Sequence, residues 1–130
     1  MGLVLPPFPD AETVVMALLE PLASTVTATP ATLVPPLIRV NRVGGSDDGI
    51  TDHPRMEIAC YGQDREQAWQ LAEQCRQAIL GSPRTVAHGV LIDNARTDNP
   101  PTQTPYAHTE DIRRVLGYFR LSWRRPRATS

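Results

Sequence analysis

The sequence has no lysine, no long apolar run and no recognisable leader, and each absence narrows the class of protein. All 13 basic residues are arginine, which we attribute to codon usage in a GC-rich genome rather than to a ligand. No apolar run reaches the ~20 residues that a membrane-spanning helix needs. Residues 1–12 lack the basic start and the continuous apolar core of a signal peptide. We therefore expect a protein that is made and kept in the cytosol, with no membrane partner.

Aromatic residues are scarce, and the overall charge is close to zero. Only 5% of the residues are aromatic, and the formal net charge is −1. A nearly neutral chain has no overall attraction to nucleic acid or to an anionic membrane, although the last third of this chain is locally basic. Base stacking in complexes with single-stranded nucleic acid depends on aromatic side chains. Both shortages weaken the interpretation of the chain as a nucleic-acid-binding module.

The sequence also lacks the residue patterns of common catalytic and metal sites. Its two cysteines form no CxxC pair and its three histidines are scattered, so the spacing of zinc ligands does not occur. The acidic segment 46–52 lacks the alternating ligands of a calcium loop, and the Gly-Gly pair at 44–45 precedes no phosphate-binding helix. His108 and Asp111 form no recognisable constellation with a nucleophile. We predict a protein without enzyme activity, cofactor or metal.

Residues 55–81 carry the clearest structural pattern. Met56, Ile58 and Cys60 occupy alternate positions, which is the period of a strand with one buried face. Residues 64–80 predict a helix, with Asp64 as its N-cap and Gly81 as its stop. Its apolar stripe consists of Ala68, Leu71, Ala72, Cys75, Ala78 and Ile79. Both cysteines lie on predicted inward faces, so we interpret them as small buried side chains rather than as a disulfide.

The whole pattern predicts a single α+β domain over residues 1–124, with a mostly antiparallel sheet and two main helices packed on one face. The other predicted elements are a helix at 10–22, a marginal edge strand at 24–29, a long β-hairpin at 37–61 with its tip at 44–54, strands at 89–97 and 115–124, a loop at 98–105 and a flexible tail at 125–130. Alternation in the last strand places Trp123 on its buried face. Trp69 lies one helical step off the apolar stripe, so we expect it to be less buried.

Arginine and tyrosine recur on strand faces that should point away from the core. The candidate interface residues are Arg39, Arg42, Arg55, Tyr61, Leu116, Tyr118 and Arg120. Protein interfaces are enriched in arginine and tyrosine, and aromatic residues with a leucine on a solvated face would need a cover. The alternative is an ordinary solvent-facing sheet with cross-strand ion pairs, for example from Arg55 and Glu57. The sequence leaves both interpretations open.

Three segments between residues 33 and 124 carry a family resemblance. They are LVPPLIRVNRVGG, DHPRMEIACYGQDREQAWQLAEQCRQAIL and RRVLGYFRLSWR. The patterns VxRxGG and PRxxIxxYGxDRxxAxxLA contribute most of this resemblance. Together they resemble the tail terminator proteins of long-tailed bacteriophages, also called tail completion or head-to-tail joining proteins. The versions from phages of actinobacteria are the most similar, and the all-arginine composition agrees with that source.

The resemblance implies a structural role and supplies no catalytic residues. Members of this family form a hexameric ring that caps the finished tail tube, stops its polymerisation and docks to the head connector. The implied partners are further copies of the chain, the tail tube protein, the head–tail connector or stopper protein, and DNA that only passes through the lumen. The resemblance also implies assembly in the host cytoplasm and a final location in the virion.

The acidic hairpin tip suits such a ring. Asp47, Asp48 and Asp52 would project a negative patch toward the lumen or an axial partner, and DNA slides past negative charge without sticking. Other neck, connector or tail-tube-related structural proteins share related α+β folds, so they remain alternatives. A small nucleic-acid-binding or peptide-binding module that uses the arginine and tyrosine face is the alternative from another class.

Overall fold

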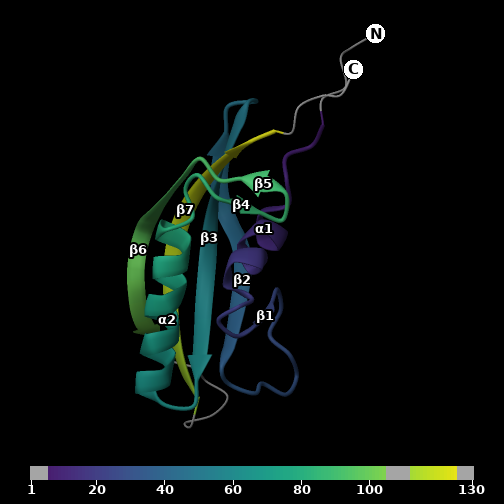
Figure 1. Ribbon diagram of the computed structural model, residues 1–130. Helices are drawn as coiled ribbons and strands as arrows, with labels where there is room; N and C mark the ends of the chain where they lie inside the picture. Colours follow the sequence, from purple (N-terminus) through teal and green to yellow (C-terminus); the bar gives the residue numbers. More distant parts are fainter. Residues whose placement is uncertain (1–5, 105–111, 126–130) are drawn as a thin grey trace.

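Strand β3 (Thr51–Gly62) lies in the middle of a five-stranded sheet, and the rest of the chain packs around it (Figure 1). The computed structural model describes residues 6–104 and 112–125. Its other elements are α1 (Ala11–Leu19), β1 (Ser24–Val26), β2 (Leu37–Asp47), α2 (Arg65–Leu80), β4 (Val86–Ala87), β5 (Val90–Leu91), β6 (Asn94–Thr104) and β7 (Arg113–Arg124). The sheet order is β1-β2-β3-β7-β6, with β1 parallel to β2 and the other neighbours antiparallel. The predicted α+β class is confirmed.

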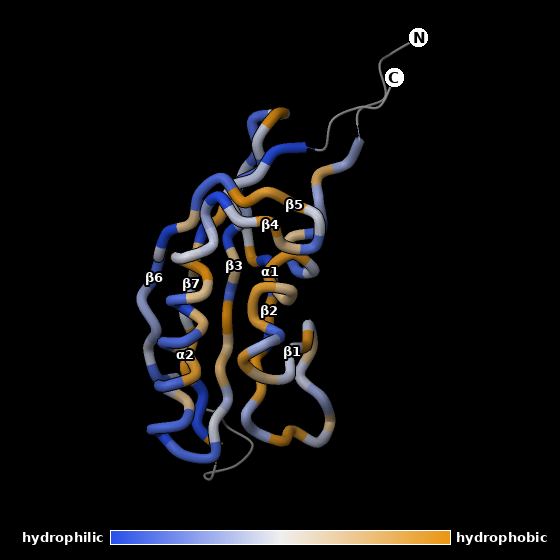
Figure 2. Tube along the Cα trace, in the orientation of Figure 1, coloured by the Kyte–Doolittle hydropathy of each residue, from blue (hydrophilic) through white to orange (hydrophobic). Residues whose placement is uncertain are grey.

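Both helices pack on the same face of the sheet and enclose the main core. Alternate residues of β3 and β7 point into this layer, and the largest of their fully buried side chains are Met56, Ile58, Phe119, Leu121 and Trp123. Hydrophobic residues concentrate along β3 and α1 in Figure 2. Burial of apolar surface at about 25 cal/mol per Å² makes this layer the main source of stability. No helix in the described residues is long and apolar enough to span a membrane.

A tight turn joins β3 to α2 and holds the helix against the sheet. Asp64 Oδ1 accepts a hydrogen bond from Gln67 N at 2.8 Å, and Gln67 Oε1 accepts one from Gln63 N at 2.7 Å. These bonds satisfy amide groups that the start of a helix leaves unpaired. A Cβ at Gly62 would lie 2.4 Å from Ala68 N, so only glycine allows the end of the strand to approach the helix this closely.

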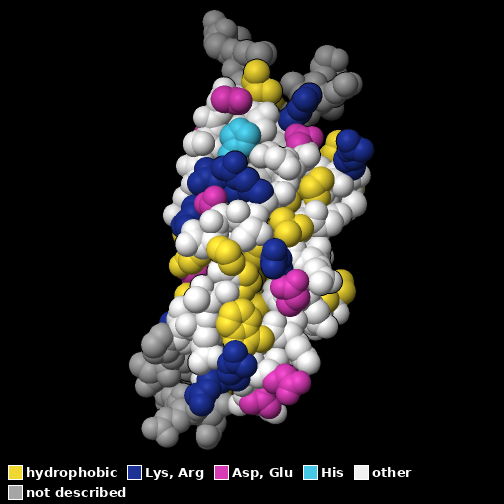
Figure 3. Space-filling view, turned by 90° about the vertical axis from the view of Figure 1, so that its left-hand side faces the viewer, with side chains coloured by type: hydrophobic (Ala, Val, Ile, Leu, Met, Phe, Trp, Pro, Cys, Tyr) yellow, Lys and Arg dark blue, Asp and Glu magenta, His cyan; other side chains and the backbone are white. Residues whose placement is uncertain are grey.

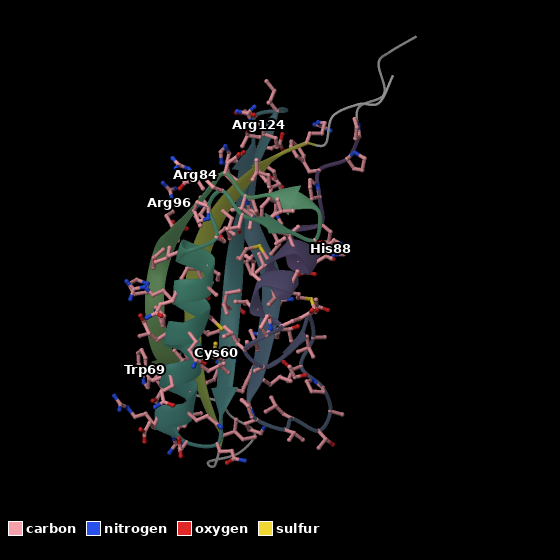
Figure 4. The ribbon with its side chains drawn as sticks, in the orientation of Figure 1. Cys60, Trp69, Arg84, His88, Arg96 and Arg124 are labelled. Carbon is pink, nitrogen blue, oxygen red and sulfur yellow. The ribbon has the colours of Figure 1, made fainter. Side chains whose placement is uncertain are left out.

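The two cysteines meet where α2 packs on β3. Cys60 Sγ and Cys75 Sγ lie 3.7 Å apart, and both are buried free thiols. Figure 4 shows Cys60 between α2 and the sheet. The hydrogen bond with Cys75 and burial together raise the pKa of the Cys60 thiol. Because the thiolate is the reactive form, we interpret both residues as core side chains, in agreement with the sequence.

The first helix and the hairpin differ from their predicted bounds. The helix ends at Leu19 rather than at residue 22, because Pro21 cannot continue it. The hairpin strands extend through most of the segment predicted as a loop. Gly45 pairs with Pro54 and Asp47 pairs with Asp52, so that only residues 48–50 form the turn.

The segment predicted as a loop at 98–105 is mostly strand, because β6 continues to Thr104. Its two prolines, Pro100 and Pro101, lie on an edge strand, where the register with β7 shifts between Asn99 and Thr102. Proline is tolerated on edge strands and at bulges because no ladder hydrogen bond is lost there. The strand predicted at 89–97 is instead divided between β5, which pairs with β4, and the start of β6.

Arg125 ties the first described residues to the hairpin tip. Its Nη1 donates to Pro6 O at 2.6 Å, and its guanidinium lies 4.2 Å from the centre of the Phe8 ring. Its Nη2 donates to Gly49 O at 3.1 Å, and its backbone N–H donates to Ile50 O at 3.2 Å. Residue 125 is therefore part of the fold, and the rest of the predicted tail, 126–130, lies outside the described residues.

We expect Trp123→Ala to lower the free energy of unfolding by about 3–5 kcal/mol, because the fully buried indole would leave a cavity in the core. Trp69 is only partly buried at the edge of the same core, so Trp69→Ala should cost clearly less. Urea denaturation of both variants measures the two losses. Equal, small losses would contradict the inward orientation of Trp123 on β7.

Candidate functional site

The face of the sheet that points away from the helices, which we call the open face, carries most of the predicted interface residues. They are Arg39 on β2, Arg55 on β3, and Leu116, Tyr118 and Arg120 on β7. Their strands are direct neighbours, and strand alternation turns these side chains away from the main core. The structure therefore brings residues from three strands into one surface.

Tyr61 belongs to the same face but is not a surface residue, which corrects its place in the predicted interface. It is 1% exposed and forms a second, small core with Leu37 and Ala59. The partly buried residues that pack on this cluster are Val26, Leu33, Ile112 and Leu116. The chain itself therefore supplies the apolar cover that this end of the open face needs.

Glu57 organises the β2 side of the remaining open face. Arg39 Nη2 lies 2.8 Å from Glu57 Oε1, and Tyr118 Oη donates to Glu57 Oε2 at 3.1 Å. Burial and the hydrogen bond to Glu57 raise the pKa of Tyr118. Cross-strand ion pairs, the alternative that the sequence left open, are thus present. A single exposed pair contributes little to stability, whereas a linked set orients its side chains.

Asp98 organises the β6 side, where one carboxylate serves two guanidinium groups. Arg55 Nε lies 2.8 Å and Arg120 Nη2 3.4 Å from the same oxygen, Oδ2 of Asp98. The hydrogen bond from Arg55 is the main cause that lowers the pKa of Asp98, and Arg120 adds to it. The Arg55 guanidinium also lies 4.3 Å from the centre of the Tyr118 ring, a cation–π contact.

A polar cleft of about 330 Å³ opens beside Arg120, and we call it the basic cleft. It is lined by Ser46, His53, Asn94, Arg96, Arg120 and Ser122. Arg96 stands directly opposite Arg120 in the register of β6 and β7, and no carboxylate in the described residues forms an ion pair with it. From the β6 side, basic side chains gather around an acidic one, next to a histidine (Figure 3). Arg96 projects outward from β6 in Figure 4.

The sequence did not reveal this cleft, because its residues come from four strands that are far apart in the chain. His53 Nδ1 and Ser122 Oγ lie 2.8 Å apart across β3 and β7. Both residues lie in segments that carry the family resemblance, but neither belongs to the two patterns that contribute most of it. The one available signal was Arg96 between two small residues near the end of the strand predicted at 89–97, and a single arginine does not indicate a cleft.

Arg42 and Asp52 do not belong to the surfaces predicted for them. Arg42 shares the strand parity of Val40 and is paired with the buried Met56, so it lies on the opposite side of β2 from Arg39. It makes two hydrogen bonds to Asp52, at 2.7 and 2.8 Å. Asp52 is only 2% exposed, because it lies within the extended hairpin and not at its tip. This pair is a structural contact.

Asp47 and Asp48 do lie at the exposed hairpin tip, where they shape the turn. Asp47 Oδ1 accepts from Gly49 N at 2.9 Å, and Asp48 Oδ1 accepts from Ile50 N at 2.9 Å and Thr51 N at 2.7 Å. The bonds from the backbone of Thr51 and Ile50 lower the pKa of Asp48. Both carboxylates remain available to an outside partner.

Within the described part of the chain, no three histidine, cysteine or acidic side chains are grouped to hold a metal ion. His108 and Asp111 lie outside the described residues. The open face and the hairpin tip are candidate contact surfaces, because ion pairs and turn hydrogen bonds hold their charged side chains at the surface.

Comparisons with known proteins show the family and a similar fold. A family model described as phage tail termination protein matches residues 7–130, which include segments at both ends that carry none of the resemblance in the sequence. The curated proteins gave no match. A chain from a solved structure, "Virion of native gene transfer agent (GTA) particle", is similar in fold, with a TM-score of 0.60 and 18% identity. The similarity covers 88% of this chain and 87% of that one.

Asp52→Asn should lower the free energy of unfolding by about 1–3 kcal/mol, because it weakens a bidentate contact to Arg42 and removes a buried charge that compensates the guanidinium. The matched control is Asp47→Asn at the exposed tip, which should change the free energy of unfolding by less than about 0.5 kcal/mol. Thermal or urea unfolding measures both. An equal response of the two variants would contradict the different roles assigned to these carboxylates.

Proposed function

This chain belongs to the phage tail termination protein family, and we propose that six copies of it close into a ring at the head-proximal end of the tail tube. The ring stops polymerisation of the tube protein on one side and docks to the head–tail connector, or stopper, protein on the other. It is assembled in the host cytoplasm and stays in the virion, and DNA only passes through its lumen. The family match over residues 7–130 carries the proposal.

The fold supports a structural role in a phage-like particle. The similar chain of known structure comes from a virion of a gene transfer agent particle. In this chain, the strongest candidate surface is a set of arginine and tyrosine side chains. Such side chains are typical of protein contacts.

The open face is the proposed contact between neighbouring copies. A ring made of one repeated chain needs a heterologous contact, in which one surface meets a different surface of the next copy. The side chains of Arg39, Arg55 and Arg120 are 22–29% exposed. Their ion pairs, and the contacts of Tyr118 with Glu57 and Arg55, hold this set in fixed positions. A surface that is already ordered loses little side-chain entropy on binding.

Pairing of edge strands fits this chain less well than a contact between faces. Strand β1 has only three residues, and β6 carries two prolines and irregular register. Short edges, prolines and irregular pairing are the features that keep sheets from adding a further strand. We therefore place the contact on the open face.

The hairpin tip is the second proposed surface. Asp47 and Asp48 are exposed at the end of a long two-stranded arm. We assign this negative tip to the lumen or its rim, where repulsion of phosphate lets DNA slide, or to contact with an axial partner. Asp52 has no part in this role, because it is buried against Arg42.

We expect the purified protein to assemble with itself, alone or on purified tail tubes of the same phage, and six copies to be the dominant assembly. Light scattering and native mass spectrometry measure the number of copies. A strictly monomeric protein at high concentration that also stays monomeric in virions would contradict the ring.

The basic cleft favours one second candidate, a nucleic-acid-binding module, and a titration separates the two. We expect no binding of DNA or RNA above background at about 0.15 M salt, because ion pairs already neutralise part of the open face. Fluorescence anisotropy with labelled oligonucleotides gives the affinity. Micromolar binding with a steep salt dependence would favour the nucleic-acid module over the ring.

A further inference from the structure

Charge is unevenly divided between the two faces of the molecule, although the chain as a whole is nearly neutral. The helical layer, which we define as α1 and α2 with their capping residues, holds six carboxylates and two guanidinium groups, a formal charge of −4. The carboxylates are Asp10, Glu12, Glu20, Asp64, Glu66 and Glu73, and the guanidinium groups are Arg65 and Arg76. Beside the two organising carboxylates of the open face, Glu57 and Asp98, lie four guanidinium groups, which gives this part of the face a formal charge of +2; they are Arg39, Arg55, Arg96 and Arg120. Arg114 and Arg124 also lie on this side of β7.

The positive excess is concentrated in the basic cleft. Asp98 is shared by Arg55 and Arg120, and it lies 2.8 Å from the first and 3.4 Å from the second. Arg96 stands opposite Arg120 and forms no ion pair in the described residues. Like charges directly opposite each other on two strands are destabilising. A carboxylate from outside the chain would relieve this repulsion.

We propose that the basic cleft of one copy receives carboxylate side chains from the helical layer of the next copy. This rests on the proposed ring and assigns the two surfaces that meet in it. Planar guanidinium groups bind carboxylates through short, charge-assisted hydrogen bonds, and Arg96 and Arg120 present two of them side by side. The cleft of about 330 Å³ has room for an acidic side chain.

The arrangement of the two surfaces suits a ring. The open face and the helical layer lie on opposite sides of the sheet (Figure 1), so a contact between them is head-to-tail by construction. Two open faces brought together would oppose positive charge with positive charge. The repulsion between like charges lowers the stability of such a contact, so it disfavours a dimer with two-fold symmetry. Charge therefore selects the contact that can close a ring.

Two charge-reversal variants test the contact. The sheet variant, Arg96→Glu, places a carboxylate opposite Arg120 and breaks no ion pair in the described residues, so the fold should stay intact. The helix variant combines Glu20→Arg and Glu73→Arg, one exposed position at each helix. The matched control, Arg65→Glu, makes the same change in charge as the sheet variant but in the helical layer.

Assembly is measured by light scattering and native mass spectrometry, alone and on purified tail tubes, with circular dichroism to confirm folding. The sheet and helix variants should each need at least about tenfold more protein to assemble. Arg65→Glu adds a carboxylate to the negative layer, so it should need no more protein than the wild type. An equimolar mixture of the two variants should form rings with equal numbers of each, because each introduced carboxylate then faces introduced guanidinium groups. Wild-type assembly should weaken as salt rises from about 0.05 to 0.5 M.

The outcomes separate this contact from the ring itself. Wild-type rings together with unimpaired single variants, or a mixture that stays unassembled, would overturn the charge contact and leave the ring standing. A wild type that is monomeric even on tail tubes would overturn the ring, and the contact with it. A sheet variant that forms rings but no longer joins the tube would show that the cleft receives a carboxylate of another virion protein, which also overturns the proposal.

Discussion

The close packing of α2 on β3 is the constraint on which the rest of the structure depends. β3 is buried on its helical face, with Met56 and Ile58 in the main core, and its last residues are buried on the open face as well, with Tyr61 in the second cluster. Gly62 lets the helix start directly at the end of this strand, because any side chain there would strike the helix backbone. β2 and β7 pair along the two sides of β3, β6 adds outside β7, and α1 completes the helical layer over β2. The open face exists because both helices lie on the other side.

The sequence predicted those parts of the fold that local signals determine. Alternation set the inward faces of β3 and β7, and Asp64 marked the start of α2. Local signals gave the wrong prediction for β6, where Pro100 and Pro101 suggested a loop. An edge strand is held by its partner, here β7, and a register shift can place prolines outside the hydrogen-bond ladder. Pairing between distant segments overrode the local preference.

Less of the candidate site could be predicted. Alternation placed Arg39, Arg55 and Arg120 on one face, but the same period excludes Arg42, which shares the parity of Val40. The burial of Tyr61 depends on the connection before β2, and that of Asp52 on a hairpin that stays paired almost to its tip. Arg96 and His53 approach the same cleft only through the order of four strands. Contacts of this kind have no sequence period.

The hydrogen bonds of Arg125 determine which parts of the chain lie at one end of the molecule. They hold residue 6, residue 125 and the hairpin turn at the same end of the molecule, while the junction of β3 and α2 lies at the other (Figure 1). Rotational symmetry repeats one end of every copy in one direction and does not exchange the two ends. A closed ring of this chain would therefore be polar. A particle joined through it could tell its two sides apart by chemistry alone, with residues 6 and 125 and the acidic turn at one end of each copy and the start of α2 at the other.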